Sequence, residues 1–333
     1  MKAMSFYAPA PVERRPLQLT DLPTPDPGPN QVLVRVSACG VCRTDLHVIE
    51  GELPSHKSPL VPGHQVVGTV EKLGRGVESL EAGARVGVPW VHRTCGHCPL
   101  CFRGRENLCD CALFNGYDVN GGYAEYVLSH RSFTFPLPDA FPDLQAAPLL
   151  CAGVIGYRAL RLADVPPGGR LGLYGFGGSA HVVIQIAVHR GLEVYVFSRS
   201  EEHGALARDL GAYWVGSARE GPPRKLDASI IFAPAGELIP LALEHLTKGG
   251  VLSLAGIYMT PVPTLDYARH LYDEKVIRSA ANSTRQDVLE LLELAARVPV
   301  LTRVQPHPLE AANDALIDLK QGRINGTVAL TLP

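Results

Sequence analysis

Four cysteines in the segment CGHCPLCFRGRENLC have the strongest metal-binding spacing in the chain. Cys95, Cys98, Cys101 and Cys109 follow the pattern C-x2-C-x2-C-x7-C. Four thiolates in one short loop can close a tetrahedral shell around zinc and leave no position open for chemistry. The alternatives are a redox pair or disulfides, and an iron–sulfur cluster, whose common bacterial run has a much shorter last gap followed by Pro. We therefore predict a structural zinc site, with Cys111 outside the spacing as a bystander.

A second set of possible metal ligands is spread along the chain. The stretch CGVCRTDLH contains Cys39 and Cys42, His64 lies in the loop VPGHQVVG, and Cys151 lies much further along. A C-x-x-C pair alone fits a disulfide oxidoreductase, a metal site or an accident of sequence. A catalytic zinc takes three protein ligands, of which two cysteines and one histidine are one known set, and keeps a fourth position for water or substrate. The three cysteines and one histidine named here could supply such a set of two cysteines and one histidine, with one cysteine left over.

The segment YGFGGSAHVV follows an apolar run and precedes a helical one, as a nucleotide-binding turn does. Gly175, Gly177 and Ala180 give the pattern G-x-G-x-x-A, with Gly178 beside the second glycine. Such glycines allow a tight turn and the close approach of a pyrophosphate to the helix N-terminus, where unpaired N–H groups and the helix dipole favour negative charge. The pattern alone is often just a turn, but between a strand and a helix it indicates a dinucleotide site.

The end of the next expected strand, EVYVF, bears on the choice between the two nicotinamide cofactors. An NAD enzyme would place an acid there for the ribose 2′-hydroxyl, and that acid would repel a 2′-phosphate. This chain has Ser198, Arg199 and Ser200 instead, followed by Glu201 and Glu202, which dilute the positive field. Serines can donate hydrogen bonds, and arginine can pair with phosphate through two of them. We predict a preference for NADP over NAD. The alternative is a solvated first helical turn.

Two patterns of secondary structure position these motifs. Residues 1 to about 148 read as an all-β unit of short strands, such as QVLVRVSA and QVVGTVEKLG, between Pro and Gly turn signals. From about residue 170, apolar strands alternate with helical runs, which predicts a doubly wound parallel sheet. After about residue 284 come a helix, RQDVLELLELAAR, a strand, a second helix and a final strand, TVALTL. We expect this tail to return to the first domain.

Composition sets the broad class. The 333 residues suit roughly two domains. Hydrophobic residues make up 46% of the chain and charged residues 19%, with a net charge of −2, so there is no basic excess to hold nucleic acid. The N-terminus lacks the apolar core of a signal peptide and no run is apolar enough to cross a bilayer, so we expect a cytoplasmic protein and no membrane partner. In a reducing compartment the eight cysteines suit metal ligands or free thiols.

Several motifs, taken in order along the chain, carry a family resemblance. They are CGVCRTDLH, PGHQVVG, the four-cysteine loop, GGYAEYV, APLLCAGVIGYRAL, YGFGGSA and GRINGTVALTL. Over essentially its whole length the chain resembles the zinc-containing medium-chain alcohol dehydrogenases. The resemblance implies a GroES-like β-rich catalytic domain formed by residues 1–148 and 285–333, and a Rossmann coenzyme domain formed by residues 149–284. It also implies the interconversion of primary alcohols and aldehydes by hydride transfer to or from NADP(H) or NAD(H), in a homotetramer or homodimer.

The resemblance also assigns the residues of the second metal set. It implies Cys42, His64 and Cys151 as the catalytic zinc ligands, which leaves Cys39 as a small buried residue. Asp45 would then support the ligating histidine from behind, fixing which ring nitrogen faces the metal, whereas the alternative reading of this acid is a loop N-cap.

Five further residues take family roles by the same resemblance. Thr44 and His47 would pass the alcohol proton to solvent through the nicotinamide ribose, since a hydroxyl can relay a proton and histidine titrates near neutrality. The ordinary reading of His47 is a surface histidine. Arg43 would clamp the cofactor pyrophosphate. Leu53 and Trp90 would line the substrate pocket, and because many small-alcohol enzymes carry tryptophan at the Leu53 position, we expect room for longer or aromatic alcohols. Either residue could equally belong to the core.

The family pattern breaks at two positions. Gln65 follows the ligating histidine where relatives usually carry glutamate, and we hypothesise slower ligand exchange at the zinc as a result. Thr327 stands where relatives commonly place an arginine against the pyrophosphate. Two other functions compete with this one. A quinone or enone reductase of the same superfamily would lack the cysteine and histidine ligands that this chain retains. A zinc-binding protein without turnover has only Gln65 and Thr327 in its favour.

Overall fold

The computed structural model describes residues 1–54, 56–298 and 300–333. These residues form two compact units. Unit 1 contains Met1–Cys151, Asn282–Ala296 and Leu301–Pro333, and unit 2 contains Ala152–Ala281 and Arg297–Val300.

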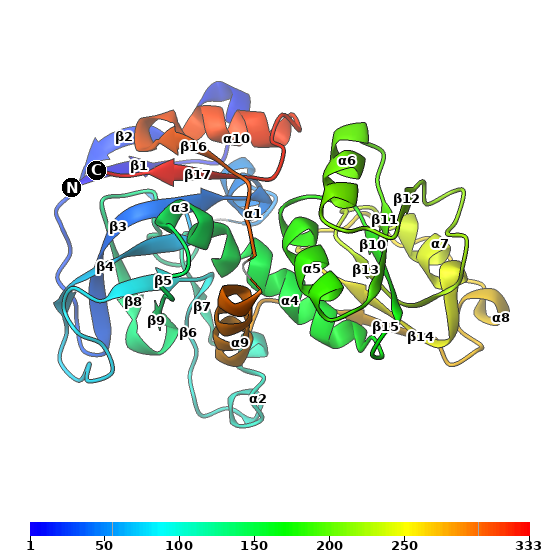
Figure 1. The fold of residues 1–333 in the computed structure, drawn as a ribbon. Helices are drawn as coiled ribbons and strands as arrows, with labels where there is room; N and C mark the ends of the chain where they lie inside the picture. The colour runs from blue at the N-terminus through cyan, green and yellow to red at the C-terminus, as the bar shows by residue number, and fades with distance from the viewer. Residues whose placement is uncertain (55, 299) are drawn as a thin grey trace. The chain divides into compact units, whose positions relative to one another are not determined.

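Unit 1 is built on a seven-stranded mixed sheet with the strand order β16-β17-β3-β4-β5-β9, to which β8 adds by pairing with β3 (Figure 1). The strands are β3 (Gln31–Val41), β4 (Val66–Leu73), β5 (Arg85–Val88), β8 (Tyr126–His130), β9 (Phe135–Pro136), β16 (Val304–Pro308) and β17 (Thr327–Thr331). Only β16 and β17 run parallel to each other. Two small antiparallel sheets join β1 (Lys2–Ser5) to β2 (Gln18–Asp21) and β6 (Val91–Arg93) to β7 (Leu113–Phe114).

The long strand β3 is the centre of this unit. Its alternating Val32, Val34 and Val36 are all buried, as β-branched residues on the core side of a strand are expected to be. The strand pairs with β4 such that Cys39 faces Val66, so the end of β3 and the start of β4 lie together. The residues that follow β3 and precede β4 are therefore brought to one end of the sheet.

The helices of unit 1 are short and lie at the margins of its sheet. They are α1 (Arg43–Glu50), α2 (Pro99–Phe102), α3 (Asp143–Ala146), α9 (Arg285–Arg297), whose last residue belongs to unit 2, and α10 (Ala312–Lys320). Short 3-10 helices cover Val12–Arg14, Glu106–Leu108, Arg131–Phe133, Ala147–Leu150 and Leu309–Ala311. The all-β expectation for residues 1–148 is thus wrong at α1, because the Cys42 thiol and the Asp45 carboxylate form a capping box that starts a helix.

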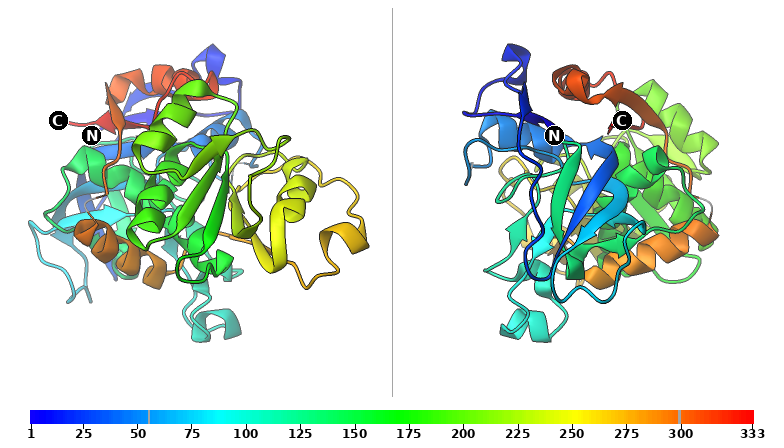
Figure 2. Two further views of the ribbon diagram at one scale, coloured as in Figure 1. Left: turned by 45° about the vertical axis from the view of Figure 1, so that its right-hand side comes forward. Right: turned by 90° about the vertical axis from the view of Figure 1, so that its left-hand side faces the viewer.

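The N-terminal segment and α10 lie side by side although they are far apart in the chain (Figure 2). The Arg15 guanidinium donates two hydrogen bonds, of 2.6 and 2.8 Å, to the Asp314 carboxylate. The buried Asn313 side chain accepts from the Leu17 amide at 3.2 Å and donates to the Leu17 carbonyl at 2.9 Å. These contacts fasten the N-terminal segment to the last helix of unit 1.

Unit 2 is a parallel sheet of six strands in the order β12-β11-β10-β13-β14-β15. The strands are β10 (Arg170–Tyr174), β11 (Glu193–Phe197), β12 (Trp214–Gly216), β13 (Leu226–Ile231), β14 (Leu246–Leu254) and β15 (Val276–Ser279). The helices are α4 (Ala152–Ala163), α5 (Gly178–His189), α6 (Glu201–Asp209), α7 (Leu238–His245) and α8 (Tyr267–His270). The strand order reverses at β10, where β11 and β13 lie on opposite sides, and this is the doubly wound arrangement predicted from the sequence.

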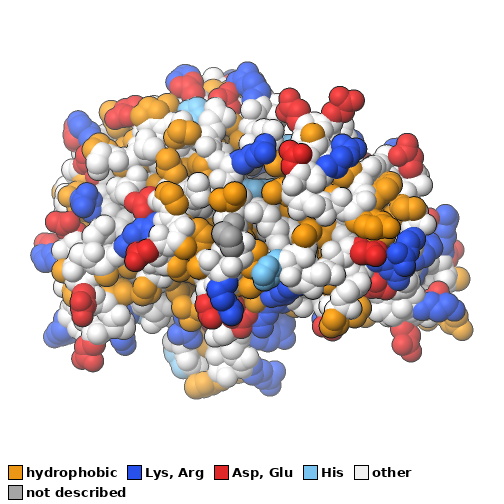
Figure 3. Space-filling view, viewed as in Figure 1, with side chains coloured by type: hydrophobic (Ala, Val, Ile, Leu, Met, Phe, Trp, Pro, Cys, Tyr) orange, Lys and Arg blue, Asp and Glu red, His pale blue; other side chains and the backbone are white. Residues whose placement is uncertain are grey.

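The surface carries charge of both signs on the face that Figure 3 shows, with acidic and basic side chains interspersed. Among the described residues, no single helix is long and apolar enough to span a membrane, and one bent pair, Asp143–Leu150 with Ala152–Ala163, meets the same criteria of length and composition.

Candidate active site

Three predicted metal ligands meet in unit 1. The Sγ atoms of Cys42 and Cys151 and a ring nitrogen of His64 all lie within 4.8 Å of one another, and Cys42 Sγ is 3.3 Å from His64 Nε2. Zinc–sulfur and zinc–nitrogen bonds of about 2.3 and 2.0 Å in tetrahedral geometry would place these two atoms about 3.5 Å apart. Two thiolates and an imidazole suit zinc, and a set of three leaves one coordination position for a substrate oxygen. The residues therefore fit a catalytic zinc ion.

Each ligand lies where a regular element begins or ends. Cys42 follows β3 and is the N-cap of α1, so the Thr44 amide donates to Cys42 Sγ at 3.3 Å. Cys151 is the C-cap of the 3-10 helix Ala147–Leu150. His64 stands two residues before β4, after Gly63, whose φ of +98° favours glycine.

The loop between β7 and β8 clamps the turn that carries His64. The amides of Gly121, Gly122 and Tyr123 donate to the carbonyls of residues 61, 63 and 62 at 2.7, 3.0 and 3.0 Å. A Cβ atom on Gly121 would lie only 1.9 Å from the Gly63 carbonyl oxygen, so this approach requires glycine. The segment GGY thus fixes the position of a metal ligand from a distant part of the chain.

Asp45 contacts His64 and closes the capping box of α1, whose N-cap is Cys42. Its Oδ2 accepts a hydrogen bond from the Cys42 amide at 2.9 Å, which caps α1, and its Oδ1 accepts from His64 Nδ1 at 3.1 Å, which turns Nε2 toward Cys42. Burial lowers the pKa of His64, but the negative charges of Asp45 and Cys42 outweigh it and raise that pKa to about 10. A buried pocket with this field favours a cation, and the zinc ion is the cation that the donor set suits.

Cys39 lies outside this ligand set. Its side chain is fully buried, its Sγ is 3.7 Å from the Gly40 carbonyl oxygen, and burial raises the pKa of its thiol well above the ordinary value. A thiol of that kind packs as a small apolar group.

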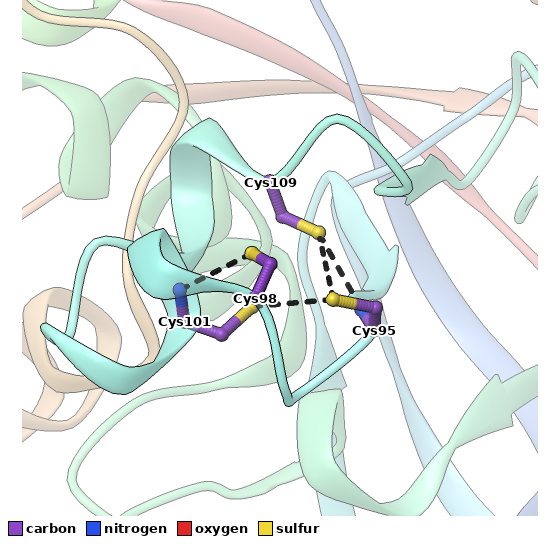
Figure 4. Close-up of side chains that lie close together, drawn as sticks. All are labelled: Cys95, Cys98, Cys101 and Cys109. Atoms are coloured by element: carbon purple, nitrogen blue, oxygen red, sulfur yellow. Dashed lines mark hydrogen bonds between the residues drawn. The ribbon is translucent and has the colours of Figure 1, made fainter.

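The four-cysteine loop converges as its spacing predicts (Figure 4). All four Sγ atoms lie within 4.8 Å of one another, with Cys95 3.9 Å from Cys101 and 3.6 Å from Cys109. A tetrahedral zinc with bonds of about 2.3 Å would separate its sulfur ligands by about 3.8 Å. The Cys101 and Cys95 amides donate to the sulfurs of Cys98 and Cys109 at 3.5 Å each. The four residues fit a closed zinc site, whereas Cys111 is exposed and outside it.

The predicted relay and clamp residues are neighbours on α1. Thr44 and His47 are three residues apart and so share one face of the helix. The His47 side chain is 12% exposed and its Nδ1 contacts the Glu52 carboxylate. Arg43 is the first residue of the helix and is exposed. Leu53 is half-buried and packs against the core of unit 1.

Trp90 lies against the metal ligand His64. Their ring centroids are 4.8 Å apart in an edge-to-face arrangement. Phe114 and Tyr117 stack on Trp90 at 5.1 and 5.9 Å. Sequence reasoning missed both rings, since nothing in the segment LFNGYD marks them as neighbours of a tryptophan more than twenty residues earlier. Together the three rings form an aromatic wall beside the metal site.

In unit 2, the glycine turn after β10 is shaped to take a pyrophosphate. Gly175 has φ +86°, Gly177 is the N-cap of α5, and Ala180 is fully buried in the first turn of that helix. A Cβ atom on Gly177 would meet nothing within 4 Å, so there is open space in front of the helix N-terminus where Gly178 begins α5. This open cradle fits the phosphate groups of a dinucleotide.

The residues after β11 are arranged around the start of α6. Ser200 caps that helix by accepting from the His203 amide at 3.3 Å, and Ser198 Oγ accepts from the Ser200 amide at 3.2 Å. Arg199 between them is exposed and makes no ion pair in the described part of the chain. Its guanidinium is therefore available to an anionic ligand.

The two departures from the family pattern have definite surroundings. Gln65 is 2% exposed, and its Nε2 has no hydrogen-bond partner among the described residues. The Thr327 amide and hydroxyl both donate to the Arg303 carbonyl, at 2.8 and 3.0 Å. Thr327 thus ties β17 to the segment before β16.

Comparisons with known proteins agree with this geometry. Residues 28–139 match the alcohol dehydrogenase GroES-like domain and residues 178–297 match the zinc-binding dehydrogenase family. A probable alcohol dehydrogenase of Mycobacterium tuberculosis, AdhA, is 45% identical over all of this chain and 97% of its own length. An alcohol dehydrogenase of Geobacillus stearothermophilus is 37% identical over 95% of this chain and 96% of its own.

Solved structures give the same picture. The cobalt- and zinc-bound thermostable alcohol dehydrogenase of Pyrobaculum aerophilum has a TM-score of 0.91 at 26% identity, covering 100% of this chain and 99% of its own. The acetophenone reductase of Geotrichum candidum in complex with NAD has a TM-score of 0.89 at 27% identity, covering 99% and 97% of the two chains.

Proposed function

The chain belongs to the zinc-containing medium-chain alcohol dehydrogenases, and we propose that it interconverts primary alcohols and aldehydes using two zinc ions per chain, with NADP(H) preferred to NAD(H). As a member of that family it is a zinc-dependent oxidoreductase that acts on alcohols with a nicotinamide cofactor. The observation that carries the proposal is the convergence of Cys42, His64 and Cys151 with one coordination position left for substrate. We assign residues 1–148 and 285–333 to the catalytic domain and residues 149–284 to the coenzyme domain.

The residues of the first site divide the chemical work between them. Zinc bound by the three ligands supplies a Lewis acid that lowers the pKa of an alcohol, and the nicotinamide supplies the hydride acceptor. The thiolates of Cys42 and Cys151 offset the metal charge. Asp45 holds His64 in the tautomer that presents Nε2. The Thr44 hydroxyl would take up the proton that the alcohol loses while it gives its own proton to the nicotinamide ribose, and His47, on the same face of α1, would pass a proton from the ribose to solvent.

The proposed roles at the cofactor follow from unit 2 and from α1. Gly175, Gly177 and Gly178 would admit the pyrophosphate to the N-terminus of α5, with Arg43 as its clamp. Ser198, Arg199 and Ser200 would hold the 2′-phosphate of NADP. Support for NADP comes from the exposed guanidinium of Arg199 and from the absence of an acid at the end of β11.

We propose longer or aromatic primary alcohols as substrates. Trp90, with Phe114 and Tyr117 stacked on it, presents an aromatic surface beside His64, and aromatic pairs are favourable beyond their buried area. Leu53 leaves more room than a tryptophan would. An enzyme of this kind should turn over benzyl alcohol or hexanol at least as well as ethanol.

A homo-oligomer, a tetramer or a dimer, is part of the proposal. Strand β15 is the last strand of the six-stranded sheet, so one side of it carries backbone groups without a strand partner in the described chain. Tyr267 and Tyr272 just before it are 66% and 67% exposed. Exposed sheet edges with apolar neighbours are covered in stable proteins, and a second copy would cover this one. We also assign the protein to the cytoplasm, since free cysteines in two metal clusters suit a reducing compartment.

The test is a panel of initial rates. Alcohol oxidation and aldehyde reduction would be measured for ethanol, hexanol, benzyl alcohol and their aldehydes, with NADP(H) and NAD(H) side by side, in protein whose zinc content has been determined. Higher kcat/KM with NADP(H) than with NAD(H) supports the assignment of Arg199 to the 2′-phosphate. The alcohol with the highest kcat/KM indicates the size of the substrate pocket. Preference for NAD(H) would overturn the cofactor assignment. No turnover with either cofactor, in protein holding two zinc ions per chain, would favour a non-catalytic zinc protein.

A further inference from the structure

We propose that Asn115 is a positioning residue that sets where Trp90 stands relative to the metal site, and so determines which alcohols the pocket accepts. The inference rests on the proposed function, because it takes Trp90 as a wall of the substrate pocket. It adds a residue that touches neither the zinc ligands nor the substrate and acts through the backbone of another.

Asn115 is fully buried, and three of its hydrogen bonds join it to the segment around Trp90. Its backbone amide donates to the Trp90 carbonyl at 2.9 Å. Its side-chain Nδ2 donates to the Pro89 carbonyl at 2.8 Å. Its Oδ1 accepts from His92 Nδ1 at 2.9 Å. The side chain of Asn115 thus holds Pro89, immediately before Trp90, and His92, two residues after it, and the backbone of Asn115 holds Trp90 itself.

The same stretch of chain also holds the metal ligand. Gly116 follows Asn115, and a Cβ atom on it would lie 2.7 Å from the Gly63 amide nitrogen, next to His64. The amide of Gly122, a few residues later, donates to the Gly63 carbonyl at 3.0 Å. The loop that follows Asn115 therefore fixes the turn that carries His64, while Asn115 itself fixes the segment 89–92 that carries Trp90. The distance from the aromatic wall to the metal is set by this single loop.

The hydrogen bonds of Asn115 suit a fixed rather than a mobile wall. An amide side chain can donate and accept at once, and both kinds of group are present here in the form of a carbonyl and an imidazole N–H. Burial lowers the pKa of His92, which keeps the ring neutral and consistent with one N–H donated to Asn115. Removing the Asn115 side chain leaves the Pro89 carbonyl and the His92 N–H without these hydrogen bonds. The segment 89–92 around Trp90 must then shift or admit water.

The first test is Asn115→Ala, with Asn115→Ser as a second variant that keeps one hydrogen-bonding atom. We expect kcat/KM for benzyl alcohol to fall about tenfold, mostly through KM, while kcat/KM for ethanol changes less than about twofold, because ethanol presents much less surface to the aromatic wall than benzyl alcohol does. For Asn115→Ser, kcat/KM for benzyl alcohol should lie between the wild-type value and that of Asn115→Ala. Bound zinc, measured in the same samples, should stay at the wild-type level.

The matched control is Asn313→Ala. Asn313 is also a buried asparagine of unit 1 whose side chain bonds to backbone groups, those of Leu17, and it belongs to α10 rather than to the site. It should lose comparable stability without changing the ratio of benzyl alcohol to ethanol turnover. An equal change in that ratio for both variants would reduce Asn115 to a stability residue and overturn the inference.

A spectroscopic reading is independent of turnover. The chain has two tryptophans, so in a Trp214→Phe background the emission comes from Trp90. Asn115→Ala should move that emission to longer wavelength and increase its quenching by acrylamide, and Asn313→Ala should not. Unchanged Trp90 emission in Asn115→Ala would overturn the inference even if the alcohol dehydrogenase activity is intact. Absence of activity in wild-type, zinc-loaded protein would instead count against the proposed function.

Discussion

The Asp45 carboxylate contacts His64 with one oxygen and the Cys42 amide with the other, so a single buried acid is tied to two of the three predicted zinc ligands. The two distances are 3.1 Å to His64 Nδ1 and 2.9 Å to the Cys42 nitrogen. The arrangement orients the histidine and caps the helix that follows Cys42. It makes Asp45 the residue whose charge most directly supports the metal site from outside the ligand set.

Asp45→Asn should weaken the catalytic zinc site more than it weakens the fold. The amide removes the negative charge behind His64, and loss of such a partner typically costs about 10- to 100-fold in metal affinity or activity. Chelator competition measures the affinity and initial rates measure the activity. Asp287→Asn is the matched control, because Asp287 is a fully buried acid that closes the capping box of α9 with Thr284 and, among the described residues, belongs to neither group of predicted metal ligands. Equal losses of zinc in both variants would contradict the role given to Asp45.

Removal of the structural zinc should loosen α9. Glu106, buried in the four-cysteine loop, accepts from the Arg285 amide at 3.0 Å and from its guanidinium at 3.2 Å, and Asn282 donates to the Asn107 carbonyl at 3.0 Å. The loop therefore holds the N-terminus of that helix, where an acid is favourable.

Cys98→Ser should lower the zinc content from two ions to one and lower Tm by about 4 to 8 °C, the shift expected for a loss of about 2 kcal/mol. Hydrogen exchange should accelerate at the start of α9. Cys111→Ser, which alters an exposed cysteine outside the cluster, should keep both ions and the wild-type Tm. Unchanged exchange in α9 after zinc loss would show that the loop and the helix are not coupled.

Unit 2 has a pH-dependent ion pair at the start of its sheet. Arg170 on β10 donates to the Asp227 carboxylate on β13 from its backbone amide at 2.8 Å and from its guanidinium at 3.1 and 3.0 Å. Burial raises the pKa of Asp227, but the hydrogen bonds and charge of Arg170 outweigh it and leave that pKa below its ordinary value. Because the folded pKa is the lower one, the pair stabilises the fold above the unfolded pKa of about 3.9 and loses this contribution as the pH falls through the folded value.

Asp227→Asn should lower the free energy of unfolding by about 1 to 3 kcal/mol at pH 7. The difference from wild type should shrink as the pH falls below about 4, where the wild-type carboxyl becomes protonated. Urea unfolding followed by the fluorescence of Trp214, on β12, in a Trp90→Phe background reports on this unit. If Asp227→Asn destabilised the protein equally at pH 7 and at a pH below about 4, the charge of Asp227 would not be the cause.

The metal sites could be predicted from the sequence because their signals are local or carried by familiar motifs. The spacing of Cys95, Cys98, Cys101 and Cys109 was enough to predict that they meet. The helical pattern of RQDVLELLELAAR placed α9 at Arg285–Arg297, and EVYVF matched β11 at Glu193–Phe197. Repeated apolar positions specify such elements because burial of one face stabilises them.

Other features left no readable pattern. Helix α1 was not predicted, because its N-cap is Cys42 and cysteine is not among the usual capping residues. The strand expected after RQDVLELLELAAR begins at Val304, and the Arg303 carbonyl before it accepts from the Thr327 amide and hydroxyl. Asn115 and Glu106 bond to backbone groups 25 or more positions away. A single polar residue with distant backbone partners has no periodicity, so only the folded arrangement shows its role.

The preference between the two cofactors should depend on Arg199. Its exposed guanidinium stands between Ser198 and Ser200 at the end of β11, where a 2′-phosphate would be held, and replacement by an acid would repel that phosphate and accept from a ribose hydroxyl instead. Arg199→Asp should therefore lower the ratio of kcat/KM for NADP to that for NAD by about 100-fold, equivalent to the loss of about 2.7 kcal/mol.

Binding of adenosine 2′,5′-bisphosphate and of adenosine 5′-monophosphate, measured by calorimetry, separates recognition of the phosphate from turnover. Wild-type protein should bind the bisphosphate more tightly, and Arg199→Asp should reverse that order. Arg224→Ala is the control for general charge, since Arg224 is exposed and pairs with Glu193 at the other end of β11. If wild-type protein binds both nucleotides equally, the serines and Arg199 do not read the 2′-phosphate, because the only difference between the two ligands is that group.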